Sequence, residues 1–298
     1  MKNFIAFILS LVLVSFSFAG CGSKQYDKYT SLIEDKTSDG NGIHIESKIW
    51  TGEYFTKKFM GDKNCTVMGK SYSGSYEKSI VNKINSYTTD VYYDEDYIEF
   101  GLREDNGELA YVNLMNSEFY ETQPYWTDVS NPSEFAISFA TEIAKQYVDN
   151  IDEYVRLIED PKQQYKEKDG KRYEITYYVV TFARKINGYF SSDYISIKVT
   201  SKGTLASIWI GDLNAFKDLS IEFDTAILDQ SIMEKVESAY TSVNFKIKKK
   251  TIEEQKIAVT PSGDICMYSR VAVEGTNAEN RDSQSGVVIL TLLGKRRN

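Results

Sequence analysis

The chain of 298 residues contains one histidine, three cysteines and four prolines. Because His44 is the only imidazole, a metal site built on two histidines is excluded, and a serine–histidine–aspartate triad would depend on this residue alone. His44 lies in the polar stretch GNGIHIES, where an exposed or edge-strand histidine is expected. Cysteines and histidines at zinc-ligand spacing are absent from the sequence. The composition therefore argues against zinc chemistry and against histidine-dependent catalysis.

An excess of positive charge is also lacking. The chain has 35 Lys and Arg against 43 Asp and Glu, which gives a formal net charge of −8. Nucleic-acid binding needs a basic surface that neutralises phosphates, so we expect no nucleic-acid partner. An acidic protein also gains no attraction to anionic lipid headgroups. The 22 tyrosines, in contrast, favour a chain rich in β-strands.

Long apolar runs are absent except at the N-terminus, where residues 4–18 are apolar apart from serines. This run has the length of a signal-peptide core and is short for a membrane span, which needs about 20 residues. The following Phe18-Ala19-Gly20-Cys21 resembles the lipobox of bacterial lipoproteins, with Phe18 in place of the usual leucine. The alternatives are an ordinary secretory signal peptide and an uncleaved membrane anchor.

The lipobox resemblance implies that residues 1–20 are removed and that Cys21 becomes a lipidated N-terminus. Two acyl chains on one residue anchor a protein stably. The resemblance thus implies a protein attached by lipid to the extracytoplasmic face of the cell membrane. Residues 21–42 are polar and rich in turn residues, and they are expected to form a tether or linker.

Residues 43–130 are predicted to form a β-rich N-terminal domain. Asn106-Gly107 stands between two strand-like runs, which is a strong hairpin signal. Residues 76–84 are compatible with one short helix. Whether this region is a further copy of the units that follow is left open.

A capped helix opens the next predicted unit, residues 131–215. Asn131 is a capping residue, Pro132 occupies the first helical position, and Glu134 is placed to return the capping hydrogen bond. Pro161 and a charged loop are expected to end the helical stretch. Apolar residues recur at helical spacing and predict a buried stripe at Ala136, Ala140, Ile143, Ala144, Tyr147 and Ile151.

Three antiparallel strands are expected to follow the helix. Asn187-Gly188 and Lys202-Gly203 are the predicted turns. The segment DYISIKVT is predicted to be a strand with a period of two residues. It places Tyr194, Ser196, Lys198 and Thr200 on one face and Ile195, Ile197 and Val199 on the other.

Residues 216–298 repeat this order of helix and strands as a second predicted α+β unit. Ser231 and Glu234 resemble a capping box, and Pro261-Ser262-Gly263-Asp264 marks a turn between two strand-like runs. Sequence identity between the two units is low, so the repeat is one of pattern.

The segment 173–210 resembles the PepSY-like units of bacterial exported proteins, including those of the YcdB/YcdC type. The resemblance is carried by turn and core positions, which are Tyr173, Tyr177, Phe182, Asn187, Gly188, Asp193, Ile195, Ile197, Val199, Gly203 and Leu205. It covers about forty residues, and the second unit only loosely. Such units are cystatin-like and are proposed to inhibit or regulate peptidases or to bind envelope components.

The predicted fold class is therefore α+β, with tandem cystatin- or PepSY-like units that each pack a helix on an antiparallel meander sheet. The predicted function is that of a lipid-anchored, extracytoplasmic, non-enzymatic binding or regulatory module that uses no cofactor and no metal. Its partner would be an envelope protein, such as a peptidase, or another envelope component. The alternative is an envelope hydrolase whose catalytic carboxylates lie far apart in the sequence.

Three short motifs resemble known sites, but each lacks a feature that the site requires. Gly69-Lys70-Ser71 resembles the end of a phosphate-binding loop, but the earlier glycine is missing. Ser75 and Lys78 fit a serine–lysine motif without its companion motifs. Residues 94–96 are acidic, yet they lack the alternation and the glycine of a calcium loop.

Four aromatic residues and two cysteines complete the candidates. Phe119, Tyr120, Tyr125 and Trp126 precede the capped helix and form either a patch that binds a partner or a buried plug. Cys65 and Cys266 form either one long-range disulfide or two separate buried thiols.

Overall fold

The structure is a computed structural model, which describes the main part of the chain after residue 60. In the described part no helix is long and apolar enough to span a membrane. The chain divides into a central unit, residues 54–82 and 87–219, and a terminal unit made of residues 1–53, 83–86 and 220–298. The described residues are 61–81, 87–115, 129–213, 215–216, 221, 223–241, 244–260 and 263–295, together with short strand pieces at 34–35, 44–45, 47–49 and 55–56.

The central unit is an antiparallel sheet with the strand order β12-β13-β14-β9-β8-β7-β6. Strands β10 and β11 pair with the outer side of β12, and β4 and β5 pair with β6. The strands are β4 (Phe55–Thr56), β5 (Lys63–Val67), β6 (Lys70–Val81), β7 (Thr88–Tyr93), β8 (Glu99–Arg103), β9 (Leu109–Asn113), β10 (Val155–Ile158), β11 (Lys162–Lys168), β12 (Lys171–Ile186), β13 (Tyr189–Thr200) and β14 (Leu205–Ile210).

Tight turns join consecutive strands where the sequence predicts them. Asn187 and Gly188 both have positive φ, 50° and 86°, which is the backbone of a hairpin turn that Asn-Gly adopts readily. The turn at Asn106-Gly107 is also present between β8 and β9, with the Gly107 amide donating to the Arg103 carbonyl. These two predicted hairpins are confirmed.

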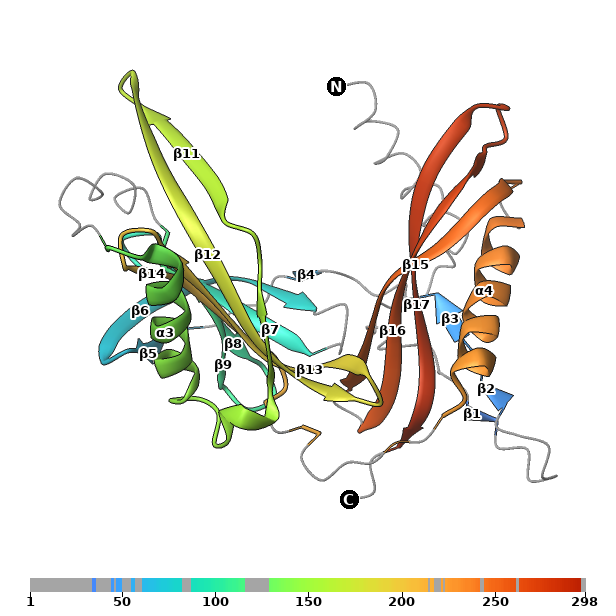
Figure 1. Ribbon diagram of the computed structural model, residues 1–298, viewed down its shortest axis with the longest axis horizontal. Helices are drawn as coiled ribbons and strands as arrows, with labels where there is room; N and C mark the ends of the chain where they lie inside the picture. Colours follow the sequence, from blue (N-terminus) through green and yellow to red (C-terminus); the bar gives the residue numbers. More distant parts are fainter. Residues whose placement is uncertain are drawn as a thin grey trace. The chain divides into compact units, whose positions relative to one another are not determined.

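Helix α3 (Pro132–Ala144) covers one face of the central sheet and contacts β12 and β13 (Figure 1). The predicted cap is present, since Asn131 accepts a hydrogen bond from the Glu134 amide at 3.5 Å. The core between helix and sheet includes the predicted stripe, and the predicted inner face of β13 is fully buried in it. Its fully buried members are Phe100, Val112, Ala136, Ala140, Ile143, Ala144, Val180, Ile195, Ile197, Val199 and Ile208.

The terminal unit has the antiparallel order β15-β16-β17-β3, and a separate pair is formed by β1 and β2. Helix α4 contacts β15 and β17 and buries Leu228, Ile232, Val236 and Tyr240 at i, i+4 spacing. The elements are β1 (Glu34–Asp35), β2 (His44–Ile45), β3 (Ser47–Ile49), α4 (Thr225–Thr241), β15 (Lys246–Val259), β16 (Asp264–Thr276) and β17 (Asp282–Lys295).

The predicted fold class, tandem α+β units that each pack a helix on an antiparallel meander sheet, is wrong. Strands dominate the described residues, which contain only two α-helices. The outer edge of β14 pairs with β9, so that the three-strand meander is part of a longer sheet. Open backbone groups at a sheet edge can recruit any further strand, and sequence periodicity carries no information about that pairing.

Local predictions fail in three places, two because of strand pairing and one because of helix capping. Residues 76–81 belong to strand β6, and the charged segment after Pro161 forms β11. Each of these two segments pairs with a neighbouring strand, and that pairing overrides the weak intrinsic preference of its residues for other backbone conformations. Helix α4 begins at Thr225 and not at Ser231, because Asp224 accepts hydrogen bonds from the Ala226 and Ile227 amides at 2.8 and 3.2 Å.

Candidate functional site

Some of the candidate residues from the sequence lie outside the described residues, and others are buried in the fold. The lipidation residue Cys21 and the aromatic residues Phe119, Tyr120, Tyr125 and Trp126 lie outside the described residues. Cys65 and Cys266 are buried free thiols, one in each unit, which confirms the second of the two alternatives. Burial raises the pKa of the Cys65 thiol to about 11, and it also raises the pKa of Cys266.

Two residues of the rejected motifs, Ser75 and Asp94, make hydrogen bonds within the fold. Ser75 lies in β6 and donates a hydrogen bond to Asp62 at 2.9 Å. Asp94 accepts hydrogen bonds from the Asp96 and Ile98 amides at 2.9 and 2.7 Å, which shapes the turn before β8. His44 lies in the short strand β2.

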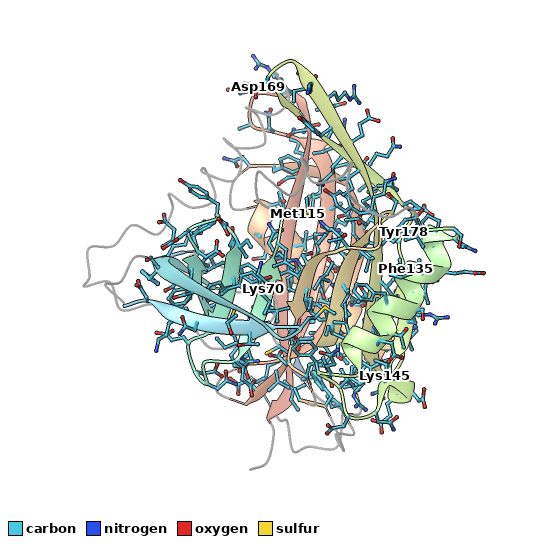
Figure 2. All side chains as sticks on the ribbon, turned by 90° about the vertical axis from the view of Figure 1, so that its left-hand side faces the viewer. Lys70, Met115, Phe135, Lys145, Asp169 and Tyr178 are labelled. Carbon is cyan, nitrogen blue, oxygen red and sulfur yellow. The ribbon has the colours of Figure 1, made fainter. Side chains whose placement is uncertain are left out.

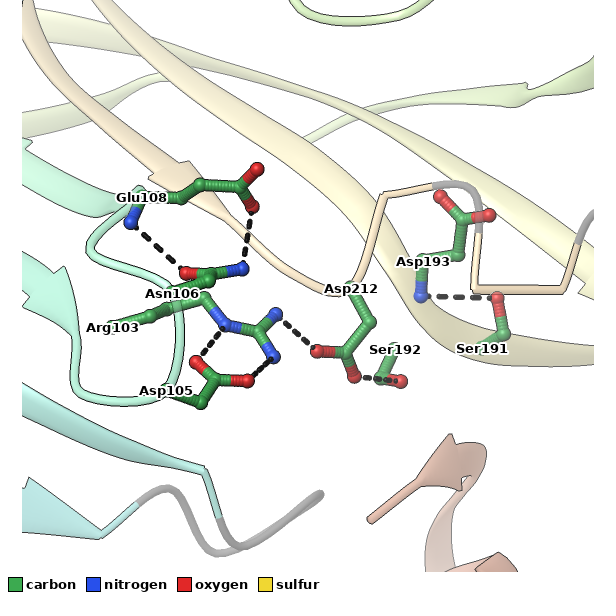
Figure 3. Close-up of polar contacts among 8 residues, drawn as sticks. All are labelled: Arg103, Asp105, Asn106, Glu108, Ser191, Ser192, Asp193 and Asp212. Atoms are coloured by element: carbon green, nitrogen blue, oxygen red, sulfur yellow. Dashed lines mark hydrogen bonds and ion pairs between the residues drawn. The ribbon is translucent and has the colours of Figure 1, made fainter. Parts of the chain in front are cut away.

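A cluster of charged side chains lies at one end of the central sheet (Figure 3). Arg103, at the end of β8, donates to Asp212 at 2.9 Å and to Asp105 at 3.1 Å. Ser192, near the start of β13, donates to the second oxygen of Asp212 at 2.6 Å. Burial alone would lower the pKa of Arg103, but hydrogen bonding to Asp105 and the charge of Asp212 raise it above its usual value.

A second buried carboxylate, that of Asp193, lies on β13 next to Ser192. Asp193 is completely buried and accepts hydrogen bonds from the Tyr154 hydroxyl at 2.5 Å and from Arg184 at 3.0 Å. Burial, followed by the hydrogen bond to Asp193, raises the pKa of Tyr154. Arg184 also forms an ion pair with Glu153 at 2.6 Å.

These two clusters hold the strand ends together. Asp193 and Asp212 each accept hydrogen bonds from an arginine side chain and from a hydroxyl group, so that their oxygens are engaged as acceptors within the fold. The Ser192 hydroxyl donates a hydrogen bond to the carboxylate of Asp212. A carboxylate is too weak a base to convert the hydroxyl into an alkoxide. The arrangement fits a structural clamp between β8, β12, β13 and the segment after β14, and it does not fit the acid of a hydrolase.

The outer edge of the central sheet, at strand β10, carries exposed apolar side chains. Among the described strands, β10 pairs only with β12, and all four of its residues are exposed. Three of these four are apolar, namely Val155, Leu157 and Ile158. Beyond β10, the β11–β12 hairpin extends to a turn at Asp169-Gly170; Figure 2 shows Asp169 at its tip, well away from α3.

A second exposed feature lies on the sheet face opposite α3. Trp209 of β14 stacks on Tyr111 of β9, with ring centroids 4.4 Å apart and an angle of 12° between the planes. The Tyr111 hydroxyl donates to Glu99 at 2.6 Å, and the Tyr93 hydroxyl donates to the other oxygen of Glu99 at 2.5 Å. Burial, followed by the bond to Glu99, raises the pKa of Tyr93 to about 12.

Neither surface is predicted from the sequence, although the sequence holds part of the signal for the second. It placed Ser196 and Lys198 on the outward face of β13, and these residues pair with Trp209 and Ser207 of β14. A tryptophan on the polar side of a strand is the signal that would have identified this face. The β10 edge gives no comparable signal, because its four residues lie where the sequence predicts the end of a helical stretch.

No group of three or more metal-ligating side chains occurs in the part of the chain that the structure describes. Comparison with protein-family models, curated proteins and solved structures finds no match to this chain. The functional argument consequently depends on the geometry of these surfaces.

Proposed function

We propose that the chain is a lipid-anchored, extracytoplasmic binding protein that docks an extended polypeptide segment of an envelope protein along strand β10. The observation that carries the proposal is the edge of β10, with four exposed residues and no second neighbour among the described strands. Anchoring through Cys21 supplies the location, and it rests on the lipobox resemblance.

The chemistry of β10 selects this kind of partner. An open strand edge offers a row of backbone donors and acceptors, which pair with another extended backbone. Val155 and Leu157 alternate with Arg156 along the strand, so that an added strand would find apolar contacts on one face and a positive charge on the other. Arg156 forms no ion pair within the described residues, which favours an acidic side chain in the partner.

The arginine contacts of the buried carboxylates favour a binding role over a catalytic one. Asp193 and Asp212 are both held by arginine side chains in the sheet interior. A partner with an extended segment, including a peptidase or its substrate, would be bound and regulated through the backbone. Such binding requires no cofactor.

The docking proposal is tested by photocrosslinking in intact cells. A photoreactive phenylalanine analogue is placed at Leu157, and for comparison at Ile227 of α4, because both residues are 37% exposed. We expect one discrete crosslinked protein from position 157 and none from position 227. The same products from both positions, or no product from position 157, would refute docking on β10.

The anchor is tested separately. The mass of the N-terminal peptide of the mature protein should show acyl chains on Cys21, and Cys21→Ala should move the protein from the membrane fraction to the soluble one. An unmodified Cys21 would refute the anchor, whatever the outcome of crosslinking.

A further inference from the structure

The indole of Trp209 is rigidly presented on the face of the central sheet that lies opposite α3. It is 45% exposed although one side of its ring is covered by Tyr111. Tyr111 is itself only 4% exposed, and Glu99 fixes its hydroxyl. Its ring lies against Gly101, where a Cβ atom would come within 2.3 Å of the ring. Trp209 is therefore an exposed apolar surface on a preorganised support.

A row of polar side chains runs directly beside this indole. Cross-strand pairing places Lys198, Ser207, Asn113 and Glu99 next to one another on β13, β14, β9 and β8. Ser207 and Trp209 are two positions apart on β14 and so share the same face. We call Trp209 and these four neighbours the aromatic–polar face.

The hydrogen-bonding capacity of this row is only partly used. The Ser207 hydroxyl is buried and has no hydrogen-bond partner among the described residues. The Asn113 side-chain oxygen accepts from the Met115 amide at 3.2 Å, which leaves its two amide hydrogens free within the described part of the chain. A buried hydroxyl without a partner destabilises a fold, so its presence calls for an explanation such as a ligand.

Lys198 adds a cation to the row. Its ammonium group lies 5.2 Å from the centre of the Tyr177 ring. Burial, followed by repulsion from Lys162, lowers its pKa. Glu99 provides carboxylate oxygens at the other end of the row. The face thus offers neutral, cationic and anionic partners within three strands of a flat aromatic surface.

We propose that the aromatic–polar face binds a neutral oligosaccharide, with one sugar ring stacked on Trp209 and its hydroxyls hydrogen-bonded by Ser207, Asn113 and Lys198. A pyranose ring has an apolar C–H face and a rim of hydroxyls that both donate and accept, which matches an indole bordered by mixed polar groups. This site is separate from the β10 edge, and it does not depend on the docking proposal.

Nucleic acid stacks on aromatic rings as well, but the charges here argue against it. Binding of a phosphate backbone needs a positively charged track. The face has Lys198 as its one cation among these five residues and Glu99 as an opposing carboxylate, and the whole chain carries a net charge of −8. A neutral hydroxyl-rich ligand encounters no such repulsion.

The test uses calorimetric titration of the purified mature protein with maltohexaose, cellohexaose and chitohexaose at millimolar concentration. We expect at least one to bind. Trp209→Ala should weaken that binding by about tenfold or more through loss of stacking, whereas Trp209→Phe, which retains a ring, should weaken it less. Tyr97→Ala is the control, because Tyr97 is a 76% exposed aromatic residue in the turn before β8 and is not one of the five residues of this face.

Ser207→Ala separates ligand binding from a structural role. Removal of a buried hydroxyl without a partner should leave Tm unchanged or raise it, and the same change should weaken oligosaccharide binding. A fall in both Tm and affinity would show a structural hydroxyl and overturn its assigned role. Absence of binding by all three sugars, binding that survives Trp209→Ala, or Trp209-dependent binding of oligothymidylate instead of sugar would overturn the proposal. Crosslinking at Leu157 is independent of every one of these results.

Discussion

Replacement of Gly101 by alanine tests the packing that supports Trp209. Gly101 lies in β8 directly opposite Tyr111 of β9, and the tyrosine ring occupies the space that a side chain at position 101 would need. An added Cβ would lie 2.3 Å from one ring carbon of Tyr111 and 2.6 Å from the methyl group of Thr89. Both distances are far inside the 3.4–4 Å of ordinary contact.

The size of the effect follows from this overlap. Forcing one extra carbon into a filled site costs about 1–3 kcal/mol, because neighbouring side chains leave their preferred rotamers. The Tyr111 ring is the larger obstacle, and its movement would also displace Trp209, which stacks on it at 4.4 Å. We therefore expect Gly101→Ala to lower the free energy of unfolding by about 1–3 kcal/mol and to weaken oligosaccharide binding as well.

Chemical denaturation, followed by circular dichroism, measures this cost. Gly286→Ala is the matched control in a strand, since the nearest atom to its Cβ is a carbonyl oxygen at 3.8 Å, and it should stabilise by about 0.4–1 kcal/mol. In a Tyr111→Ala background the cost of Gly101→Ala should shrink, because the ring is gone. Equal costs in both backgrounds would refute the proposed overlap.

Three further predictions concern other parts of the fold. Asp224→Ala removes the cap of α4 and should lower stability by about 1 kcal/mol in thermal denaturation, and an unchanged Tm would contradict the capping role. Arg103→Met removes the guanidinium that pairs with the buried carboxylate of Asp212 and should cost about 3–5 kcal/mol, whereas a neutral effect would show that the remaining partners of Asp212, Ser192 among them, satisfy it. The native Cys65 thiol should resist iodoacetamide at neutral pH and react after unfolding. Because its folded pKa of about 11 exceeds the ordinary 9.0, the folded state retains the proton more tightly, so stability should decrease as pH rises through that interval, and a flat profile would contradict the burial.

Much of the local structure followed from residue chemistry alone. Gly107, Asn187 and Gly188 adopt positive φ at little cost, so the two Asn-Gly turns can be predicted from the sequence. Asn131 and Pro132 marked the start of α3 for the same kind of reason. The alternation of Ile195, Ile197 and Val199 with polar neighbours fixed which face of β13 enters the core.

The candidate surfaces were much less predictable. Trp209 and Tyr111 are about a hundred residues apart, and their stacking depends on the pairing of β14 with β9. Asp212 reaches Arg103 through the same pairing. The β10 edge was hidden because four residues are too few for a periodic signal.

The amino-acid sequence by itself determined the turns, the helix cap, the buried faces and the acidic charge, because these depend on the preferences of a residue and its immediate neighbours. The tertiary structure alone decided which strand edges join and which edge stays open. Backbone hydrogen bonds are nearly the same for every residue, so the choice of partner strand is made by the packing of the whole sheet. The stacked indole, the buried ion pairs and the open β10 edge all result from that choice.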